Sequence, residues 1–225
     1  MGDVPDVRAT LHGGNANGAR RKPVVAGVRP ASAEHPALFG AQYRADCLGY
    51  QRHYEEALQI NREVHDMLRQ TLGAEHPDTL LSWLRMAEKL GNMGMHLEAE
   101  QVEREVHRVM RQSLGDEHPE TLVSAEQLGR TLARQQKLVE AANILRLVHA
   151  TKKRAIGDEH YSTLRCTYTL ARLLSDMGET AEAEQMMRSA LRAQQRLLGE
   201  EHPDTLASAH ILVRILARRE KHTEA

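Results

Sequence analysis

The chain has 225 residues, 30 Lys and Arg against 31 Asp and Glu, and a formal net charge of −1 at pH 7. This balance argues against a general binder of nucleic acid or membrane surfaces, which needs a basic excess. The lack of a long apolar run predicts no transmembrane helix and no secretory signal, and two widely separated cysteines, Cys47 and Cys166, favour a reducing, cytoplasmic setting. Aromatic residues make up only 3% of the chain, so the core must consist of aliphatic side chains, as is typical of packed helices.

Residues 1–33 differ in composition from the rest of the chain. Five glycines and three prolines are spread through this segment, and no helical period is visible. We therefore expect a disordered tail, because too few apolar residues are present to offset the entropy of ordering. The triplet of Arg20, Arg21 and Lys22 has two interpretations, a solvated stretch or a weak nuclear or docking patch.

A nine-residue motif recurs along the remaining chain. Its copies begin at Leu72, Leu114, Ile156 and Leu198, and they share Gly at the second position, Glu-His at the fourth and fifth, and Thr-Leu at the end. The copies are 42 residues apart each time, and a fainter copy containing His35 lies one residue short of this period. A nine-residue motif that recurs at a fixed spacing indicates a repeat architecture.

The residue pattern within each repeat predicts two helices. Pro77 suits a first helical position, where its missing N–H costs nothing, and apolar residues with helical spacing follow to about Asn92. A second helix is expected from near Leu97 to Leu114, with Gly115 just beyond its end. Small residues recur in both helices and predict that the two helices approach closely. They are Ala45, Ala87, Gly129 and Ala171 in the first helices and Ala57, Ala99, Ala141 and Ala183 in the second.

A pair of such helices cannot bury its own apolar faces, so we expect an all-α fold in which neighbouring repeats stack into a solenoid. The expected repeat domain covers residues 34–225, with repeats at about 34–73, 74–115, 116–157 and 158–199 and a partial repeat at 200–225. The partial repeat stops where a second helix would begin, and its helix, expected at about 204–219, is apolar on more than one face. This helix either caps the end of the stack or, if the chain is truncated, exposes an apolar face that recruits another chain.

The repeat resembles the tetratricopeptide repeat, and more narrowly the 42-residue version found in kinesin light chains. The resemblance rests on the nine-residue motif and on the pairs Glu98-Ala99, Glu140-Ala141 and Glu182-Ala183. It implies a right-handed α-solenoid whose first helices line a concave, protein-binding groove, with a kinesin heavy chain or a cargo protein as the partners that the family suggests. Kinesin light chains typically carry paired Asn residues that grip cargo peptides. The corresponding pairs here are Leu84-Arg85, Glu126-Gln127, Tyr168-Thr169 and His210-Ile211.

The register of the repeat assigns groove-facing positions in the first helices. They are Leu81, Leu84, Glu88 and Asn92, then Val123, Glu126, Arg130 and Arg134, then Arg165, Tyr168, Arg172 and Asp176, and finally His210, Arg214 and Arg218. Six arginines in one groove favour an acidic, extended or helical peptide as the ligand, with apolar anchorage near Leu81 and Leu84. In the alternative interpretation, the arginines pair with acids such as Glu126 and Asp176 on a solvated face.

Histidines form two series with the same 42-residue spacing. The first comprises His76, His118, His160 and His202 within the motif, and the second comprises His65, His107 and His149. Stacked repeats hold equivalent positions on the order of 10 Å apart, whereas metal ligands converge to about 2 Å from one ion, so we predict no metal site. The first series is expected to shape the turn between repeats, and the second to be partly buried, with pH sensing as a hypothesis.

The sequence contains none of the common nucleophile, phosphate-loop, dinucleotide or zinc-protease motifs, so we predict neither an enzyme nor a cofactor. The two cysteines lie within apolar helical patterns and are expected to pack in the core. A non-enzymatic scaffold or adaptor of the kinesin light chain type is the favoured function. The alternatives are a regulatory or sensor repeat fragment of a larger multidomain protein, and a nucleic-acid reader, which the charge balance disfavours.

Overall fold

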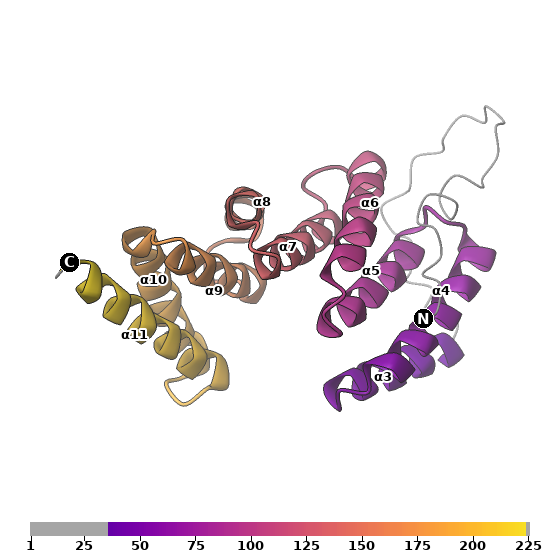
Figure 1. Ribbon diagram of the computed structural model, residues 1–225, viewed down its shortest axis with the longest axis horizontal. Helices are drawn as coiled ribbons and strands as arrows, with labels where there is room; N and C mark the ends of the chain where they lie inside the picture. The colour runs from indigo at the N-terminus through magenta and orange to yellow at the C-terminus, as the bar shows by residue number, and fades with distance from the viewer. Residues whose placement is uncertain (1–35, 224–225) are drawn as a thin grey trace. The chain divides into compact units, whose positions relative to one another are not determined.

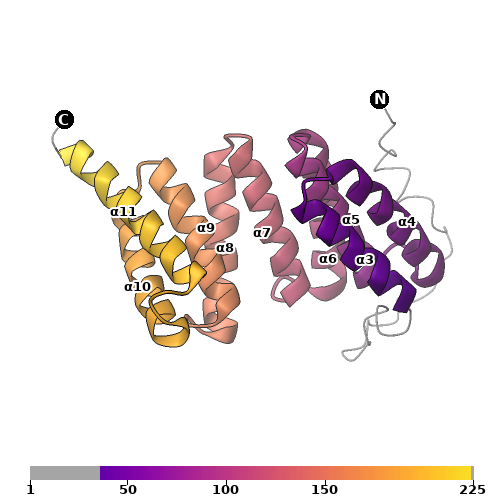
Figure 2. The ribbon, with the colours of Figure 1, turned by 90° about the horizontal axis from the view of Figure 1, so that it is seen from below.

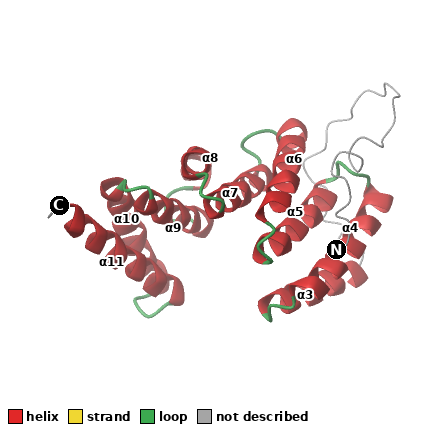
Figure 3. Ribbon diagram, viewed as in Figure 1, coloured by secondary structure: helices red, strands yellow, loops and turns green. Residues whose placement is uncertain are grey.

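The structure, a computed structural model, describes residues 36–223. In this range every regular element is an α-helix, and short loops join the helices (Figure 1, Figure 3). The helices are α3 (Pro36–Tyr50), α4 (Tyr54–Leu72), α5 (Pro77–Asn92), α6 (His96–Leu114), α7 (Pro119–Arg134), α8 (Leu138–Ile156), α9 (Tyr161–Asp176), α10 (Thr180–Leu198) and α11 (Pro203–Thr223). The expected tail at 1–33, His35 and the last two residues lie outside the described residues.

The predicted helix bounds are confirmed in the complete repeats. The first helix of the second repeat, α5, begins at Pro77 and ends at Asn92, and α6 ends at Leu114 as expected. The first helix among the described residues, α3, has 15 residues where α5 has 16, in line with the copy of the motif that lies one residue short of the 42-residue period.

The predicted end of the last helix is wrong, because α11 continues to Thr223 instead of ending near Arg219. The preceding repeats turn at Gly94, Gln136 and Gly178, where φ is positive. The residue 42 positions after Gly178 is Glu220. Glu is a good helix former, and the helix continues through this position.

The described chain divides into two compact units, whose boundary in the sequence falls between Gln127 and Leu128, within α7. In the first unit, α4 packs against α3 and α5, and α5 packs against α6. In the second unit, α9 packs against α8, α10 and α11, and α10 also packs against α11 (Figure 2). Helices thus contact their near neighbours in the chain, which is the packing of stacked helix-turn-helix repeats, and the all-α fold class is confirmed.

The recurring small residues lie where the helices of a pair meet. Those that are fully buried, with 0% of their surface exposed, are Ala45, Ala57, Ala87, Ala99, Ala141, Ala171 and Ala183. Gly129 of α7 is the tightest of these positions, since a Cβ added there would lie 2.8 Å from the Cγ atom of Leu145 in α8. The predicted close approach of paired helices is therefore confirmed.

Each copy of the nine-residue motif forms the junction between two repeats. Its glycine takes a backbone conformation that is almost restricted to glycine, as at Gly73, where φ is 93° and ψ is 165°. Thr79 is buried and donates from Oγ1 to the carbonyl oxygen of Gly73, at 2.8 Å. The junction at Gly73 is thus closed by a backbone turn and by a side-chain hydrogen bond within the same motif, whereas Thr121, Thr163 and Thr205 of the other copies are buried without such a bond.

Replacing Gly73 by alanine should lower the free energy of unfolding by about 1–3 kcal/mol, because a Cβ is strained at this φ and ψ. The space around the position is empty, so the cost comes from the backbone alone. Gly40 of α3 is a matched control, since a Cβ there also meets nothing but the backbone is helical. Gly40→Ala should be neutral or stabilise the chain by up to about 1 kcal/mol in urea titrations followed by circular dichroism. Equal effects of the two substitutions would contradict this explanation of the motif.

The histidine of the motif caps the following helix. His76 accepts a hydrogen bond at Nδ1 from the backbone N–H of Asp78, at 3.2 Å, and His160 accepts one from Ser162 at 3.1 Å. His118 and His202 do the same in their repeats. An N-cap acceptor satisfies one of the free N–H groups at a helix start, so the expected role of this series in the turn is confirmed.

Candidate functional site

The predicted groove positions of the first unit lie on α5. Leu81 is half-buried, and Glu88 and Asn92 are exposed. Leu84, by contrast, is a core residue with 2% of its surface exposed, and its carbonyl oxygen accepts a hydrogen bond from Nε2 of Gln127 at 2.7 Å. Leu84 therefore offers no apolar surface to a ligand, and Leu81 is the apolar residue of the predicted pair that remains partly accessible.

The six predicted arginines all lie in the second unit. Arg130 and Arg134 belong to α7, Arg165 and Arg172 to α9, and Arg214 and Arg218 to α11. Arg130 and Arg218 are half-buried, and the other four are exposed. Of the remaining predicted positions, Glu126 is buried, Val123 and Tyr168 are half-buried, and Asp176 and His210 are exposed.

Three of these arginines line one cavity of about 350 Å³, which we call the arginine cavity. Arg130 and Arg134 enter it from α7 and Arg172 from α9, and Leu138, Leu145 and Leu173 contribute apolar lining. Within the described part of the chain, none of the three arginines forms an ion pair or a hydrogen bond. The structure thus places Arg172 of α9 at the same cavity as Arg130 and Arg134 of α7.

The alternative interpretation, in which the arginines pair with acids, holds for Arg218. Its Nη1 lies 2.5 Å from Oδ1 of Asp176 and 3.1 Å from Oγ of Ser175. Arg165 also has an interaction partner. Asp176 is the acidic residue that lines the arginine cavity, and its carboxylate is engaged by Arg218.

A second, smaller cavity of about 200 Å³ lies next along α9, and we call it the tyrosine cavity. Tyr161, Leu164, Arg165 and Tyr168 of α9 line it together with Asp204, Ala207 and Ser208 of α11 and Gln194 of α10. Tyr161 is 59% exposed, so the cavity presents an aromatic surface to solvent. The two cavities use successive segments of the same helix, residues 161–168 and 169–176.

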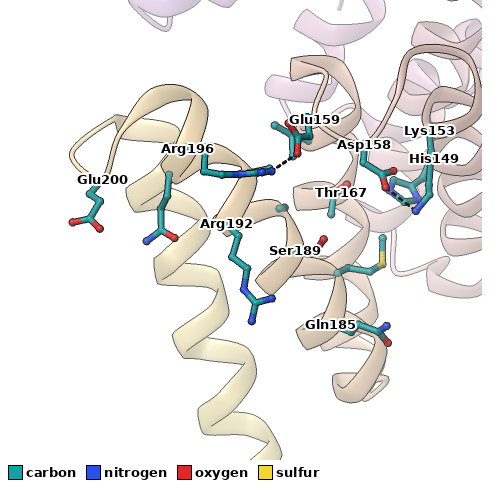
Figure 4. Close-up of a pocket in the computed structure, with 15 residues that line it drawn as sticks. His149, Lys153, Asp158, Glu159, Thr167, Gln185, Ser189, Arg192, Arg196 and Glu200 are labelled. Carbon is teal, nitrogen blue, oxygen red and sulfur yellow. Dashed lines mark hydrogen bonds and ion pairs between the residues drawn. The ribbon is translucent and has the colours of Figure 1, made fainter.

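The sequence analysis missed a larger hollow of about 850 Å³ between α8 and α10 in the second unit (Figure 4). Its charged rim is partly neutralised, since Lys153 pairs with Asp158 at 2.9 Å and Arg196 pairs with Glu159. The repeat register offers one signal for it. Three successive repeats have valine at one position, namely Val64, Val106 and Val148, and the next repeat has Ala190 there, which lines the hollow.

The second histidine series connects neighbouring repeats in the first unit. His65 Nδ1 lies 3.0 Å from Oγ of Ser82, and His107 Nδ1 lies 3.0 Å from Oγ of Ser124. Each serine hydroxyl donates its proton to a backbone carbonyl oxygen, so the hydrogen bonds assign the Nδ1 proton to the histidine. Burial lowers the pKa of His65 and of His107 below the ordinary value of 6.5, and Arg111 lowers that of His107 further.

Acidification from pH 7.5 to 5 should therefore lower the free energy of unfolding. The pKa of each histidine is lower in the folded chain than in the unfolded chain, so the stabilisation is present above pH 6.5 and is lost as the pH falls toward the folded-state pKa. Thermal melts followed by circular dichroism at both pH values measure the loss. A variant with His65→Asn and His107→Asn should lose part of this pH dependence, and an unchanged dependence would refute the assignment to these two residues.

The described residues hold no group of three or more His, Cys, Asp or Glu side chains that is arranged to bind a metal ion. Both cysteines are free thiols, and Cys166 is fully buried. None of the helices in residues 36–223 combines the length and apolar character needed to cross a membrane.

Comparison with known proteins identifies the repeats. Models of the tetratricopeptide repeat match residues 47–78 and 163–204, and a further model of this repeat matches residues 80–154, so that together they cover more than half of the chain. No protein with a curated description matches the sequence.

Solved structures give the same result. Nearly identical TPR-like repeats of a Podosopora anserina protein described as a kinesin light chain are 29% identical, with a TM-score of 0.71 over 85% of this chain and 91% of that one. BtubC (BKLC) from P. vanneervenii, 15% identical, has a TM-score of 0.66 over 87% of this chain and 86% of that one. The Rap conjugation gene regulator of plasmid pLS20, solved in complex with the Phr* peptide, is 12% identical, with a TM-score of 0.58 over 92% of this chain and 61% of that one. The last two show the fold alone. The chain belongs to the tetratricopeptide repeat family, and its 42-residue repeats are similar in structure to kinesin light chain-like repeats.

Proposed function

We propose that the chain is a non-enzymatic scaffold whose second unit binds an acidic, extended peptide of a partner protein across α9. The observation that supports this most is the arginine cavity, where Arg130, Arg134 and Arg172 have no acidic partner among the described residues. Guanidinium groups match carboxylates in bidentate geometry, and a peptide that supplies acids would neutralise this cluster. The tyrosine cavity beside it supplies an aromatic surface for an apolar side chain of the same peptide.

The relatives support a protein or peptide ligand. Repeats of this family bind other proteins, and the Rap regulator was solved with a peptide. We propose an adaptor role like that of kinesin light chains, with a kinesin heavy chain or a cargo protein as the partner to test first. Because Tyr168 and Thr169 replace one of the Asn pairs typical of that family, recognition by charge at the neighbouring arginines takes the place of recognition by amides. Both cysteines are free, which suits the reducing cytoplasm that we propose as the setting.

Charge reversal of the groove tests this function. The variant with Arg130→Glu, Arg172→Glu and Arg214→Glu should lose binding of an acidic decapeptide by about 100-fold or more, because attraction becomes like-charge repulsion. Fluorescence anisotropy of a fluorescein-labelled peptide measures the affinity, and binding by the wild type should weaken as salt is raised.

A control with the same change in net charge is available on the hollow between α8 and α10. There Lys153→Glu, Arg192→Glu and Arg196→Glu alter three cationic residues that lie outside both the arginine and the tyrosine cavities. This control should retain most of the affinity. Equal binding by the wild type and the groove variant would refute the proposed site, and loss confined to the control would move the site to the hollow.

A further inference from the structure

We infer that the arginine cavity is a subsite for a phosphoryl group, so that the preferred ligand is a peptide phosphorylated on serine or threonine. This inference rests on the proposed function, since it specifies which anion the peptide presents to the second unit. It is argued from the charge of the cavity, its size and its distance from the tyrosine cavity.

The charge of the cavity exceeds what one carboxylate can neutralise. Arg130 and Arg134 are one turn apart on α7, so their side chains lie on the same face of the helix, and Arg172 approaches from α9. The carboxylate of Asp176 is engaged by Arg218. A phosphorylated side chain carries a charge of about −1.5 to −2 and three strong acceptor oxygens, so it can satisfy several guanidinium groups at once, as a singly charged carboxylate cannot.

The shape of the cavity favours one such group and disfavours a nucleic-acid strand. Its volume is about 350 Å³, and Leu138, Leu145 and Leu173 supply part of its lining. The positive charge does not continue unopposed beyond this cavity, because Arg218 of α11 is paired and Asp204 of α11 lines the tyrosine cavity. A bound nucleic-acid strand needs a basic track that follows successive phosphates, and this groove offers a single cluster.

The distance between the two cavities predicts the spacing of the ligand. The α9 segments that line them are centred about eight residues apart, which corresponds to roughly 12 Å along the helix axis. An extended peptide advances about 3.3 Å per residue, so it spans this distance in about three or four residues. The preferred ligand therefore carries an apolar or aromatic side chain three or four positions from the phosphorylated residue.

Three fluorescein-labelled decapeptides test the inference. They share an acidic sequence with a leucine three positions from the centre, and the central residue is serine, phosphoserine or glutamate. The phosphoserine peptide should bind about tenfold more tightly than the glutamate peptide, because of its second charge and its additional acceptor oxygen. Arg130→Gln with Arg172→Gln should reduce this preference to less than about twofold, while Arg214→Gln, an exposed groove arginine outside the cavity, should preserve it.

A small-molecule probe separates this inference from the proposed function. Phenyl phosphate, and much less benzoate, should shift the side-chain Nε–Hε resonances of Arg130 and Arg172 in NMR titrations. If the glutamate and phosphoserine peptides bind equally well, the subsite is refuted and the peptide groove stands. If phenyl phosphate shifts these resonances but no peptide binds, the groove is refuted and the subsite stands. If a single-stranded RNA displaces phenyl phosphate and binds more tightly than the phosphopeptide, the assignment to a peptide is overturned.

Discussion

Replacing Trp83 by alanine is expected to lower the free energy of unfolding of the first unit by about 3–5 kcal/mol, the usual cost of truncating a buried aromatic side chain. Trp83 is the one tryptophan of the chain and is 3% exposed. It packs in a cluster with Leu80, Leu90 and Val106, and its ring stacks on His65 of α4 at a centroid distance of 5.3 Å. The substitution thus removes contacts within its own repeat and with the preceding one. Urea titration followed by far-ultraviolet circular dichroism measures the change in the free energy of unfolding.

The same substitution should raise the pKa of His65, because burial is the largest cause of its lowering and Trp83 covers the imidazole. NMR titration of the histidine ring measures the pKa. Trp83→Phe keeps an aromatic ring in place and serves as the control, with a smaller loss of stability and a smaller shift. A loss below about 1 kcal/mol for Trp83→Ala would show that the cluster does not depend on this residue.

Replacing Leu145 by alanine should destabilise the second unit by about 2–5 kcal/mol. Leu145 is fully buried in α8, in a cluster with Leu132, Leu174 and Met187. It also lies against Gly129, where an added Cβ would be 2.8 Å from its Cγ atom. Gly129→Ala alone should therefore destabilise the chain by about 1–3 kcal/mol, although alanine is the better helix former.

The two substitutions should couple strongly. In the Leu145→Ala background the clash between the added Cβ and the Leu145 side chain is absent, so Gly129→Ala should become neutral or stabilising. A double-mutant cycle measures the coupling energy between the two substitutions. Additive effects would contradict the close approach of α7 and α8 at this position. Gly40→Ala, which meets no neighbouring atom, controls for the general effect of alanine on a helix.

Most of the fold could be predicted from the sequence because the signals that define each repeat are local. Gly73, His76, Pro77 and Thr79 lie within seven residues of one another and together end one helix and begin the next. The end of α11 could not be predicted in the same way. The turn after a first helix depends on whether one residue accepts a positive φ, and Gln136 does so in the structure although its side chain disfavours it.

The candidate site was less predictable, because exposure and pairing depend on neighbouring helices. The repeat register placed the six arginines on the first helices of the second unit, but it did not separate Arg218, which pairs with Asp176, from Arg172, which has no partner in the described chain. It also placed Leu84 on the groove surface, whereas the structure buries it in the core. The hollow between α8 and α10 is lined by side chains from several helices and loops, and its one signal in the sequence is Ala190, which stands where the earlier repeats have valine.

The hydrogen bonds that join one repeat to the next suggest how such chains vary in length. The bond of His65 to Ser82 and that of His107 to Ser124 each connect a second helix to the helix that follows it, with the same separation of 17 residues. A gain or loss of a complete 42-residue segment would thus recreate the same partners at the new junction. A gain or loss of a few residues would misalign every bond across one junction. Evolution of this chain by duplication or deletion is therefore expected to proceed in whole repeats.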